Sequence, residues 1–413
     1  MPRAIVIGGG VIGLTCAIEL RRRGMDVVVI EAEPMPRGAS WGNAGHIAVE
    51  QVEPLASIAT LRSFPARLFW RGGALGLPLG AWRAWLPFAL SMVSAARPRR
   101  FAAGKRALAS MLARALPAWR RLLEQAGAGA LLREQGHFVV WESPASAARR
   151  AAHWKAADIG EARVRDMTGD ELGEIRALTS AELTGGVRFE GSGQIEDLGL
   201  LAETLSAQLE RIGGVRRIGK AVSIAKDDGG ATVQLADGEV VAGDIVVLAA
   251  GAASAPLLRP HGYRVPLIAE RGYHIQSAVD ADWPMGTPPV VFEDRSIIVT
   301  RFRSGVRAAS FVEFAPAAYP ADPRKWARLR QHAAALGLPI APDASEWMGA
   351  RPTLPDYLPA IGRCAGFPEL LYAFGHQHLG LTLAACTAEA VGALAAGEVP
   401  PFDLAPFDIA RFG

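Results

Sequence analysis

Three glycines close to the start of the sequence have the spacing of a phosphate-binding turn. Gly8, Gly10 and Gly13 form the pattern GxGxxG, and Glu31 closes the next apolar run. The first glycine permits a tight bend, the second lets a pyrophosphate approach the backbone, and the third lets a helix pack closely on a strand. An acid at Glu31 can accept hydrogen bonds from a ribose diol and would repel a 2′-phosphate. The pattern predicts a bound dinucleotide other than NADP, and a turn that serves only packing is the alternative.

Arg351 is the second group that the sequence marks for chemistry. It lies in the segment 347–362, where Pro352, Pro355 and Pro359 hold the backbone extended. A guanidinium on such a rigid segment is preorganised to bind a planar carboxylate through two hydrogen bonds. We therefore expect Arg351 to bind the carboxylate of a small molecule, with a structural salt bridge as the alternative.

Histidines near the end of the chain form a third group. His376 and His378 lie in the turn Gly-His-Gln-His-Leu-Gly, which precedes the last apolar helix pattern. A helix N-terminus at this turn would stabilise negative charge on a bound cofactor. Two histidines can also bind a metal ion, but no third ligand follows at a metal-like spacing, so no metal site is expected.

The residues around the glycine turn predict the elements that hold it. The apolar run 4–7 predicts a buried strand, 11–23 has the spacing of a helix, and 27–30 predicts a second strand. The following loop, 37–46, is rich in glycine, small residues and hydroxyl or amide groups. Such a loop can lie along an extended cofactor, with backbone N–H groups and polar side chains toward it. This favours FAD, and an ordinary surface loop is the alternative.

Later elements would bring the remaining groups to the same place. The run 245–250 predicts a buried parallel strand, after which Gly251 would bring backbone close to the cofactor. The run 370–374 predicts another strand and 381–396 the final helix. Further helices are expected over 61–70, 82–95, 107–125, 145–157, 198–211 and 322–336, and further strands over 136–142, 215–224, 231–235, 240–242, 290–292, 296–301 and 306–314. We expect the last three strands and the strand 136–142 to form one antiparallel sheet above the cofactor.

Composition restricts the class of protein. Half of the 413 residues are hydrophobic and 21% are charged, so the chain can build sizeable cores and is not disordered. The formal charge is only +3, so no nucleic-acid partner is expected. The three cysteines are few and unpatterned, which fits a reducing compartment without disulfides. Since no signal peptide precedes the first strand, a cytoplasmic location is expected.

An aromatic and basic segment allows two interpretations, one of which is a contact with a membrane. Trp70, Trp82 and Trp85 cluster in this segment, together with arginines such as Arg71 and Arg83. One interpretation is an interfacial segment, apolar on one side and basic on the other, at the inner face of the cytoplasmic membrane. The other is a helical subdomain that covers the active site and carries solvated arginines. We favour the second interpretation, and a peripheral membrane contact stays open.

The order of these motifs resembles one enzyme family. The GxGxxG turn, the glutamate and the loop Ser-Trp-Gly-Asn-Ala-Gly of residues 40–45 are similar to the D-amino-acid dehydrogenase branch of the FAD-dependent D-amino-acid oxidase, glycine oxidase and sarcosine oxidase family. The segment Gly-Ala-Arg-Pro-Thr-Leu-Pro-Asp-Tyr-Leu-Pro-Ala-Ile-Gly of residues 349–362 is similar to the same family.

The resemblance implies an α/β fold with two domains. One is a discontinuous, Rossmann-like FAD-binding domain, and the other is an α+β substrate-binding domain with an antiparallel sheet and a helical insertion. The implied boundaries are 1–50, 190–260 and 345–413 for the FAD-binding domain, and 51–189 and 261–344 for the substrate-binding domain.

The resemblance also implies roles for individual residues. FAD would be held without a covalent bond, since no cysteine stands in 347–362. Arg351 would bind the substrate carboxylate, and Tyr273, in a turn over 270–274, is a second candidate. His46 would face the active site, and His46, His378 or water could take the proton of the substrate amine. The implied cofactor-binding residues are Gly8, Gly10, Val11, Gly13, Glu31, Ser40, Asn43, Ala44, Gly45, Gly251, Gly375, His376, Leu379 and Gly380.

The activity that the resemblance implies is dehydrogenation of a D-amino acid or a cyclic D-imino acid. The hydride on Cα would pass to flavin N5 and leave an imine, which water converts to a 2-oxo acid and ammonia when it is primary. Candidate substrates are D-alanine-like amino acids and D-proline or cis-4-hydroxy-D-proline, with a quinone or another non-O2 electron acceptor. Sarcosine-type oxidases place a lysine over flavin N5, and none of the five lysines lies in such a motif. An O2-using amine oxidase, an electron-relay subunit and an NAD-dependent reductase remain alternatives.

Overall fold

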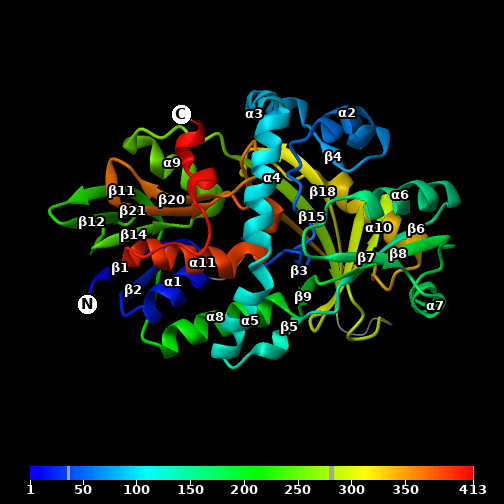
Figure 1. The fold of residues 1–413 in the computed structure, drawn as a ribbon, viewed down its shortest axis with the longest axis horizontal. Helices are drawn as coiled ribbons and strands as arrows, with labels where there is room; N and C mark the ends of the chain where they lie inside the picture. The colour runs from blue at the N-terminus through cyan, green and yellow to red at the C-terminus, as the bar shows by residue number, and fades with distance from the viewer. Residues whose placement is uncertain (35–37, 279–282, 413) are drawn as a thin grey trace.

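The structure, a computed structural model, describes residues 1–34, 38–278 and 283–412. Within these residues the chain forms two large β-sheets, which lie side by side in Figure 1 with helices around and between them. The first sheet has six strands and carries the N-terminal glycine turn. The second has nine strands and carries the proline-rich segment.

The six-stranded sheet is assembled from three separate parts of the chain. Its first five strands run parallel, and the last pairs antiparallel with its neighbour. Apolar and mostly β-branched residues fill both faces, as in parallel sheets that are covered on both sides. This sheet confirms the predicted α/β class with a Rossmann-like part. The strand order is β10 (Val215–Ile218), β2 (Asp26–Glu31), β1 (Arg3–Ile7), β14 (Ile245–Leu248), β21 (Phe367–Phe374) and β20 (Ala360–Cys364).

Helices cover one face of this sheet and a small meander covers the other. Alternate residues of β1 divide between the two sides, because successive side chains of a strand point to opposite faces. Ala4 and Val6 pack with the helices, whereas Ile5 and Ile7 pack with the meander. The helices are α1 (Val11–Arg22), α8 (Leu198–Arg211) and α11 (Gly380–Ala396), and the meander is β11 (Ala221–Asp227), β12 (Gly230–Leu235) and β13 (Val240–Gly243).

The second sheet is almost wholly antiparallel, as predicted. The exceptions are β16 with β6, and the short β4 with β18, which pair in parallel. Strands β6 and β16 are far apart in the sequence, so no hairpin turn forces them to run in opposite directions. The order is β19 (Ser345–Thr353), β15 (Ile268–Ser277), β18 (Gly305–Ala315), β17 (Ile297–Phe302), β16 (Val290–Phe292), β6 (His137–Trp141), β8 (Gly185–Glu190) and β7 (Arg163–Asp166), with β4 (Leu75–Gly76) beside β18.

A small sheet and the remaining helices complete the chain. The small sheet contains β3 (His46–Ile47), β9 (Gly193–Ile195) and β5 (Leu132–Arg133). In Figure 1 the long α4 passes in front of the gap between the two large sheets. The remaining helices are α2 (Ile58–Arg67), α3 (Trp82–Ala95), α4 (Pro98–Leu112), α5 (Ala115–Gln125), α6 (Pro144–Ala156), α7 (Gly169–Ala177), α9 (Ser254–Leu258) and α10 (Pro323–Leu336).

Three expected elements differ from the structure. The run 215–224 is two strands, because the chain leaves the six-stranded sheet at Gly219, whose N–H makes a last bond to β2 before the meander begins. The run 107–125 is the end of α4 and the whole of α5, which part near Arg114. The residues 270–274 do not form a turn but lie within the ten-residue strand β15.

The expected domain boundaries stay a prediction. The six-stranded sheet draws its strands from the ranges assigned to the FAD-binding domain. By its pairing with β15, however, β19 belongs to the larger sheet although it lies in the range 345–413. The proline-rich segment therefore crosses from one sheet to the other.

Helix α11 is one of the helices that cover the six-stranded sheet, and other helices pack against it in turn. By length and composition alone, the stretch Gln377–Ala396 is apolar enough to cross a bilayer. However, 72% of its most apolar window is buried inside the protein, where it packs against α1 and α5. A helix that is apolar all round and buried in this way is typical of a protein core.

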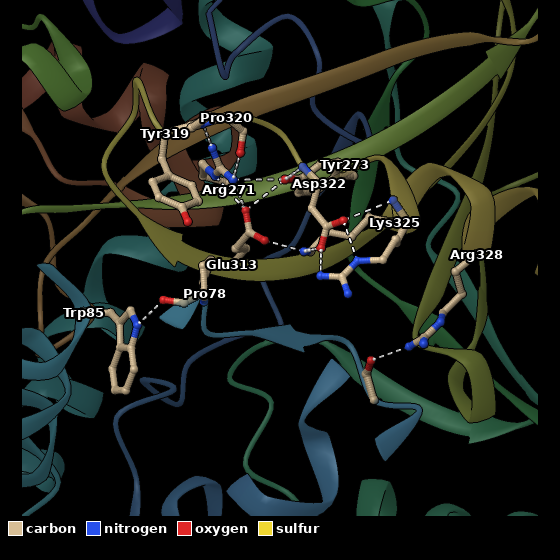
Figure 2. Close-up of polar contacts among 12 residues, drawn as sticks. Pro78, Trp85, Arg271, Tyr273, Glu313, Tyr319, Pro320, Asp322, Lys325 and Arg328 are labelled. Carbon is tan, nitrogen blue, oxygen red and sulfur yellow. Dashed lines mark hydrogen bonds and ion pairs between the residues drawn. The ribbon is translucent and has the colours of Figure 1, made fainter. Parts of the chain in front are cut away.

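A buried ionic network fastens α10 to the larger sheet. Arg271 of β15 and Lys325 of α10 both bind Glu313 of β18, and each of the three side chains is at most 1% exposed. Tyr273 donates its hydroxyl to the same carboxylate across 2.9 Å. Figure 2 shows these side chains converging on Glu313. Burial raises the pKa of Tyr273, so its hydroxyl stays protonated.

Removal of the charge of Glu313 should strongly destabilise the protein. Glu313→Gln leaves two buried cations without their shared counter-charge, and loss of one partner of a buried pair typically costs about 3–5 kcal/mol. Chemical unfolding followed by circular dichroism measures the difference. The control Glu134→Gln breaks an exposed pair with Arg120, for which a loss below about 1 kcal/mol is expected. Equal stability of the two variants would show that the buried network is not important.

Candidate functional site

A cavity of about 1070 Å³ opens at the carboxyl ends of the parallel strands. Its wall begins at the turn after β1, passes the loop after β2 and the end of β14, and reaches β19 and the turn before α11. Ligands of open parallel sheets bind at this edge. Of the predicted site residues, those that line the cavity are Gly8, Gly10, Val11, Glu31, Ser40, Asn43, Gly251, Arg351, His376 and Gly380.

The glycine turn forms one end of the cavity. Gly8 has a φ of +112°, and a Cβ there would collide with the carbonyl oxygen of Ala249. A Cβ at Gly13 would overlap the carbonyl of Gly8, so α1 can approach the turn only without a side chain at this position. The Gly9 N–H donates to the carboxylate of Glu31 at the end of β2. This end therefore offers backbone N–H groups at the start of a helix and a carboxylate beside them, the donor and acceptor set that a dinucleotide needs.

The loop after β2 forms the next part of the wall. Ser40 Oγ accepts the N–H that opens α1 across 3.1 Å, and Asn43 Oδ1 accepts the Gly45 N–H across 2.9 Å. Ala44 and Gly45 do not line the cavity in the described part of the chain. The Ala44 carbonyl instead accepts the hydroxyl of Thr300 across 2.8 Å, which ties the loop to β17 of the larger sheet.

His376 stands at the other end of the cavity, beside the start of α11. Its Nε2 lies 3.0 Å from the hydroxyl of Thr387, while its Nδ1 is buried without a hydrogen-bond partner among the described residues. Burial lowers the pKa of His376 to about 3, so the ring is neutral at physiological pH. An unpaired ring nitrogen in a cavity wall fits the polar edge of a bound cofactor. Gly375, with a φ of +79°, and Leu379 flank His376 without lining the cavity.

Arg351 reaches the cavity from β19 and is held by Glu270, the residue opposite it on β15. Arg351 Nη1 donates to Glu270 Oε1 across 3.2 Å and to the Phe311 carbonyl across 3.3 Å. Glu270 is 1% exposed, and its other oxygen accepts the hydroxyls of Tyr357 at 3.0 Å and Thr353 at 3.3 Å. Nη2 and Nε of Arg351 make no hydrogen bond to the described residues, and the side chain is 26% exposed. The guanidinium therefore keeps donors for a ligand.

Strained backbone surrounds this ion pair. Phe311, Tyr357 and Gln377 have φ values of +70°, +58° and +46°, a region that side chains other than glycine rarely adopt. Phe311 lies where the register between β15 and β18 shifts, and its carbonyl is the one that binds Arg351. Gln377 Nε2 donates to the Tyr357 carbonyl across 2.9 Å, so two strained residues hold each other. Such conformations cost on the order of 1–3 kcal/mol each and cluster at functional sites.

The alternation of β15 explains where Tyr273 lies. Glu270 and Gly272 face Arg351, and a Cβ at Gly272 would lie 2.5 Å from Cζ of the guanidinium. Arg271 and Tyr273 point to the opposite face, where they bind Glu313. Tyr273 does not line the cavity, so the structure gives it no contact with a ligand there.

His46 and His378 lie beside the cavity and not in its lining. His46 Nε2 is 3.0 Å from Glu50 Oε1, and His378 Nε2 is 2.5 Å from Gln51 Oε1. The rings of His378 and Tyr357 have centroids 6.5 Å apart. Since Tyr357 binds Glu270, His378 lies close to the carboxylate that holds Arg351. Burial lowers the pKa of His378 to about 4, so its ring is neutral at physiological pH.

Sequence reasoning assigned no role to Glu270, Tyr357 or Gln377. The run Glu-Arg-Gly-Tyr-His drew attention to Tyr273, whereas the period of a strand would have put Glu270 and Gly272 on one face. That this face meets Arg351 depends on pairing between strands far apart in the sequence. The sequence held one sign of this contact, because Gly272 is a glycine between two bulky residues.

The fold and the cavity are those of a dinucleotide-binding protein. Residues 3–394 match the FAD dependent oxidoreductase family, and the chain belongs to that family. It is 32% identical over 396 residues to D-amino acid dehydrogenase 2 of Pseudomonas aeruginosa, with 92% of each chain covered. It is 29% identical over 397 residues to the D-amino-acid oxidase of Bradyrhizobium diazoefficiens, with 94% of each covered.

A solved structure supports the fold. Glycine oxidase from Geobacillus kaustophilus superposes with a TM-score of 0.72 at 23% identity, covering 100% of this chain and 99% of that one. The predicted family, the FAD dependence and the oxidoreductase class are therefore confirmed. The residues of the cavity fit FAD, because bare backbone at Gly8, the carboxylate of Glu31 and the unpaired His376 Nδ1 lie along one continuous wall. The roles of individual residues stay proposals.

Proposed function

We propose that the protein oxidises a D-amino acid or a cyclic D-imino acid and passes the electrons to an acceptor other than O2. The proposal rests on the Arg351 guanidinium, which lines the cavity and is paired with the buried carboxylate of Glu270. A fixed guanidinium with free donors is suited to the carboxylate of an amino acid. The names of the two relatives support the D configuration.

The residues around Arg351 position the substrate. Arg351 binds its carboxylate, and Glu270, Gly272 and the Phe311 carbonyl fix the direction of the guanidinium. Fixing a reacting molecule in one orientation is a large part of what an enzyme contributes when its cofactor supplies the chemistry. Bound FAD would supply the acceptor for the hydride that leaves Cα of the substrate. The product imine hydrolyses to a 2-oxo acid and ammonia when it is primary.

The proton of the substrate amine leaves to His378 or to water. The side-chain Oε1 of Gln51 accepts from His378 Nε2, which leaves Nδ1 of this neutral ring as an acceptor. Like His378, His46 lies outside the cavity lining. We prefer His378 because its ring lies near Tyr357, which binds Glu270, whereas His46 is paired with Glu50.

The lysines favour a non-O2 acceptor. Lys220 is the only lysine that lines the cavity in the described residues, and it follows Gly219, whose N–H binds the Glu31 carbonyl across 2.8 Å. It therefore lies beside Glu31, the acid of the dinucleotide motif. An O2-using amine oxidase is the second candidate, because one relative is named as an oxidase.

An anaerobic titration of the FAD-loaded protein tests the substrate class. We expect D-amino acids or cyclic D-imino acids to bleach the flavin absorbance and their L-enantiomers to leave it unchanged. Arg351→Ala should raise the substrate concentration for half-reduction about 100-fold, since two charge-assisted hydrogen bonds are lost, and should retain FAD. Arg121→Ala, which breaks an exposed pair with Glu389, is the control.

Three outcomes would contradict the proposal. The first is flavin reduction by L-amino acids alone, and the second is an unchanged half-reduction concentration in Arg351→Ala. The third concerns the acceptor: faster turnover with O2 than with a quinone analogue would identify the protein as an oxidase.

We also propose, against the interpretation favoured from the sequence, that the acceptor is reached at a membrane surface formed by α3. Trp82, Leu86, Leu90 and Val93 form one stripe on this helix and are 50%, 38%, 64% and 53% exposed, while Phe88 on another side is buried. An exposed apolar stripe on a helix is unusual in a soluble protein and is typical of an interfacial helix.

The charge around this stripe favours anionic lipid. Between Glu53 and Glu124 the sequence has no acidic residue and twelve arginines and lysines. Arg97, Arg99 and Arg100 follow directly after α3 and are exposed. Basic residues near an anionic bilayer each contribute about 1 kcal/mol of attraction. The apolar stripe would enter the headgroup region and the arginines would bind the phosphates.

Vesicle co-sedimentation tests this membrane surface. We expect the FAD-loaded protein to bind vesicles that contain phosphatidylglycerol, and binding to weaken with salt because exposed charges are screened. The double variant L86Q/L90Q should lose most of the bound fraction, since the apolar stripe no longer enters the lipid. The control Val240→Gln changes an apolar residue that is 57% exposed on β13. Binding that is absent at low salt, or equal in L86Q/L90Q and the control, would refute the surface.

A further inference from the structure

A cluster of two histidines and a glutamate lies behind the cavity wall. His46 begins β3, Glu50 follows four residues later, and His137 begins β6 of the larger sheet. The His46 and His137 rings meet edge to face with centroids 4.4 Å apart. One ligand atom from each of the three residues lies within 4.8 Å of the other two. None of the three lines the FAD cavity.

The cluster contains buried polar atoms that the protein itself leaves unpaired. The His46 and Glu50 side chains are only 9% and 4% exposed, and His137 is 4% exposed. Glu50 Oε1 faces His46, but Glu50 Oε2 has no hydrogen-bond partner among the described residues, and neither has His46 Nδ1. A buried carboxylate oxygen without a partner is costly unless something else binds it. A cation between the three residues would supply the missing partner.

One ring nitrogen of His137 is held by a hydrogen bond, as is usual for histidines that bind a metal ion. Its Nδ1 lies 3.0 Å from the hydroxyl of Ser192, which leaves Nε2 as the ring nitrogen for a metal ion. Its ring also stacks on Phe189, with centroids 4.4 Å apart and an angle of 11° between planes. Outer-shell bonds of this kind set the tautomer and orientation of a metal-binding imidazole.

We propose that His46, Glu50 and His137 bind a divalent metal ion of the zinc class, at a site separate from the FAD cavity. Two imidazoles and one carboxylate are a ligand set that Zn²⁺ takes, with water in the fourth position. Ligand atoms on one Zn²⁺ stand about 3–3.5 Å apart, given bond lengths of about 2.0–2.2 Å. The present separations need only small side-chain rotations to reach this. The site does not involve the His376 and His378 pair.

The ion would join two parts of the chain that build the cavity. His46 directly follows the loop that carries Ser40 and Asn43, and His137 belongs to the larger sheet. A metal bound by both would hold the cofactor loop against that sheet. Metal binding therefore stabilises this loop and takes no part in the oxidation itself.

Metal binding is tested on the full-length, FAD-loaded protein after treatment with a chelator and its removal. Zn²⁺ is titrated in competition with a chromophoric chelator, and bound metal is counted by mass spectrometry. We expect one Zn²⁺ per chain. Glu50→Gln and His137→Phe should weaken binding about 100-fold or more, because even outer-shell changes weaken metal affinity about 10- to 100-fold. The readout needs no substrate, so it is independent of the proposed function.

Two further variants make the test decisive. Ser192→Ala keeps all three ligands and removes the bond that orients His137, so a loss of about 10-fold is expected even if Glu50→Gln folds poorly. His261→Ala is the matched control, since His261 also has a buried ring nitrogen without a partner but lies outside the cluster. Absence of stoichiometric Zn²⁺ in the unchanged protein, or equal affinity in Glu50→Gln and His261→Ala, would overturn the proposal and leave a hydrogen-bonded His–Glu pair.

Discussion

The ion pair between Glu270 and Arg351 is the interaction on which the site depends. A carboxylate buried on strand β15 must be paired, and the hydroxyls of Tyr357 and Thr353 and the guanidinium of Arg351 together satisfy it. Glu270 engages only Nη1 of the guanidinium, and Arg351 also lines the cavity. The same contact joins β15 to β19 and so fixes the proline-rich segment where it crosses between the two sheets.

One face of β15 positions Arg351, and the other face stabilises the strand in the sheet. One face holds Arg351 over Gly272, and the other anchors the strand through the Arg271–Glu313 pair and Lys325 of α10. This anchoring lets the neighbouring strand keep the strained Phe311, whose carbonyl binds Arg351. Strain at a binding site persists only where the surrounding structure determines it, and here a nine-stranded sheet provides that support.

Much of the fold follows from local sequence patterns. The predictions that failed concern contacts between residues far apart in the sequence. The GxGxxG turn, Glu31 and the bounds of α3 and α8 are visible because glycine spacing and apolar periodicity act within a few residues. The antiparallel sheet was also predicted, although its parallel β6–β16 contact was not, since strands far apart in sequence leave no record of direction. Arg351 could be predicted as a ligand-binding residue from the prolines that follow it in the sequence. Its partner Glu270 could not, because their contact depends on the pairing of distant strands. Tyr273 was chosen from a conspicuous sequence run, yet strand alternation turns it away from the cavity.

The most direct test of the account is a stopped-flow measurement of anaerobic flavin reduction in Glu270→Gln across substrate concentrations. If Glu270 acts by fixing the guanidinium, the apparent Kd for substrate rises about 10- to 100-fold, because a charged hydrogen bond to Arg351 is lost. The limiting rate of reduction and the FAD content then change much less, since the residue touches neither Cα nor the cofactor in this account. An unchanged Kd, with Arg351 still required for binding, would contradict it.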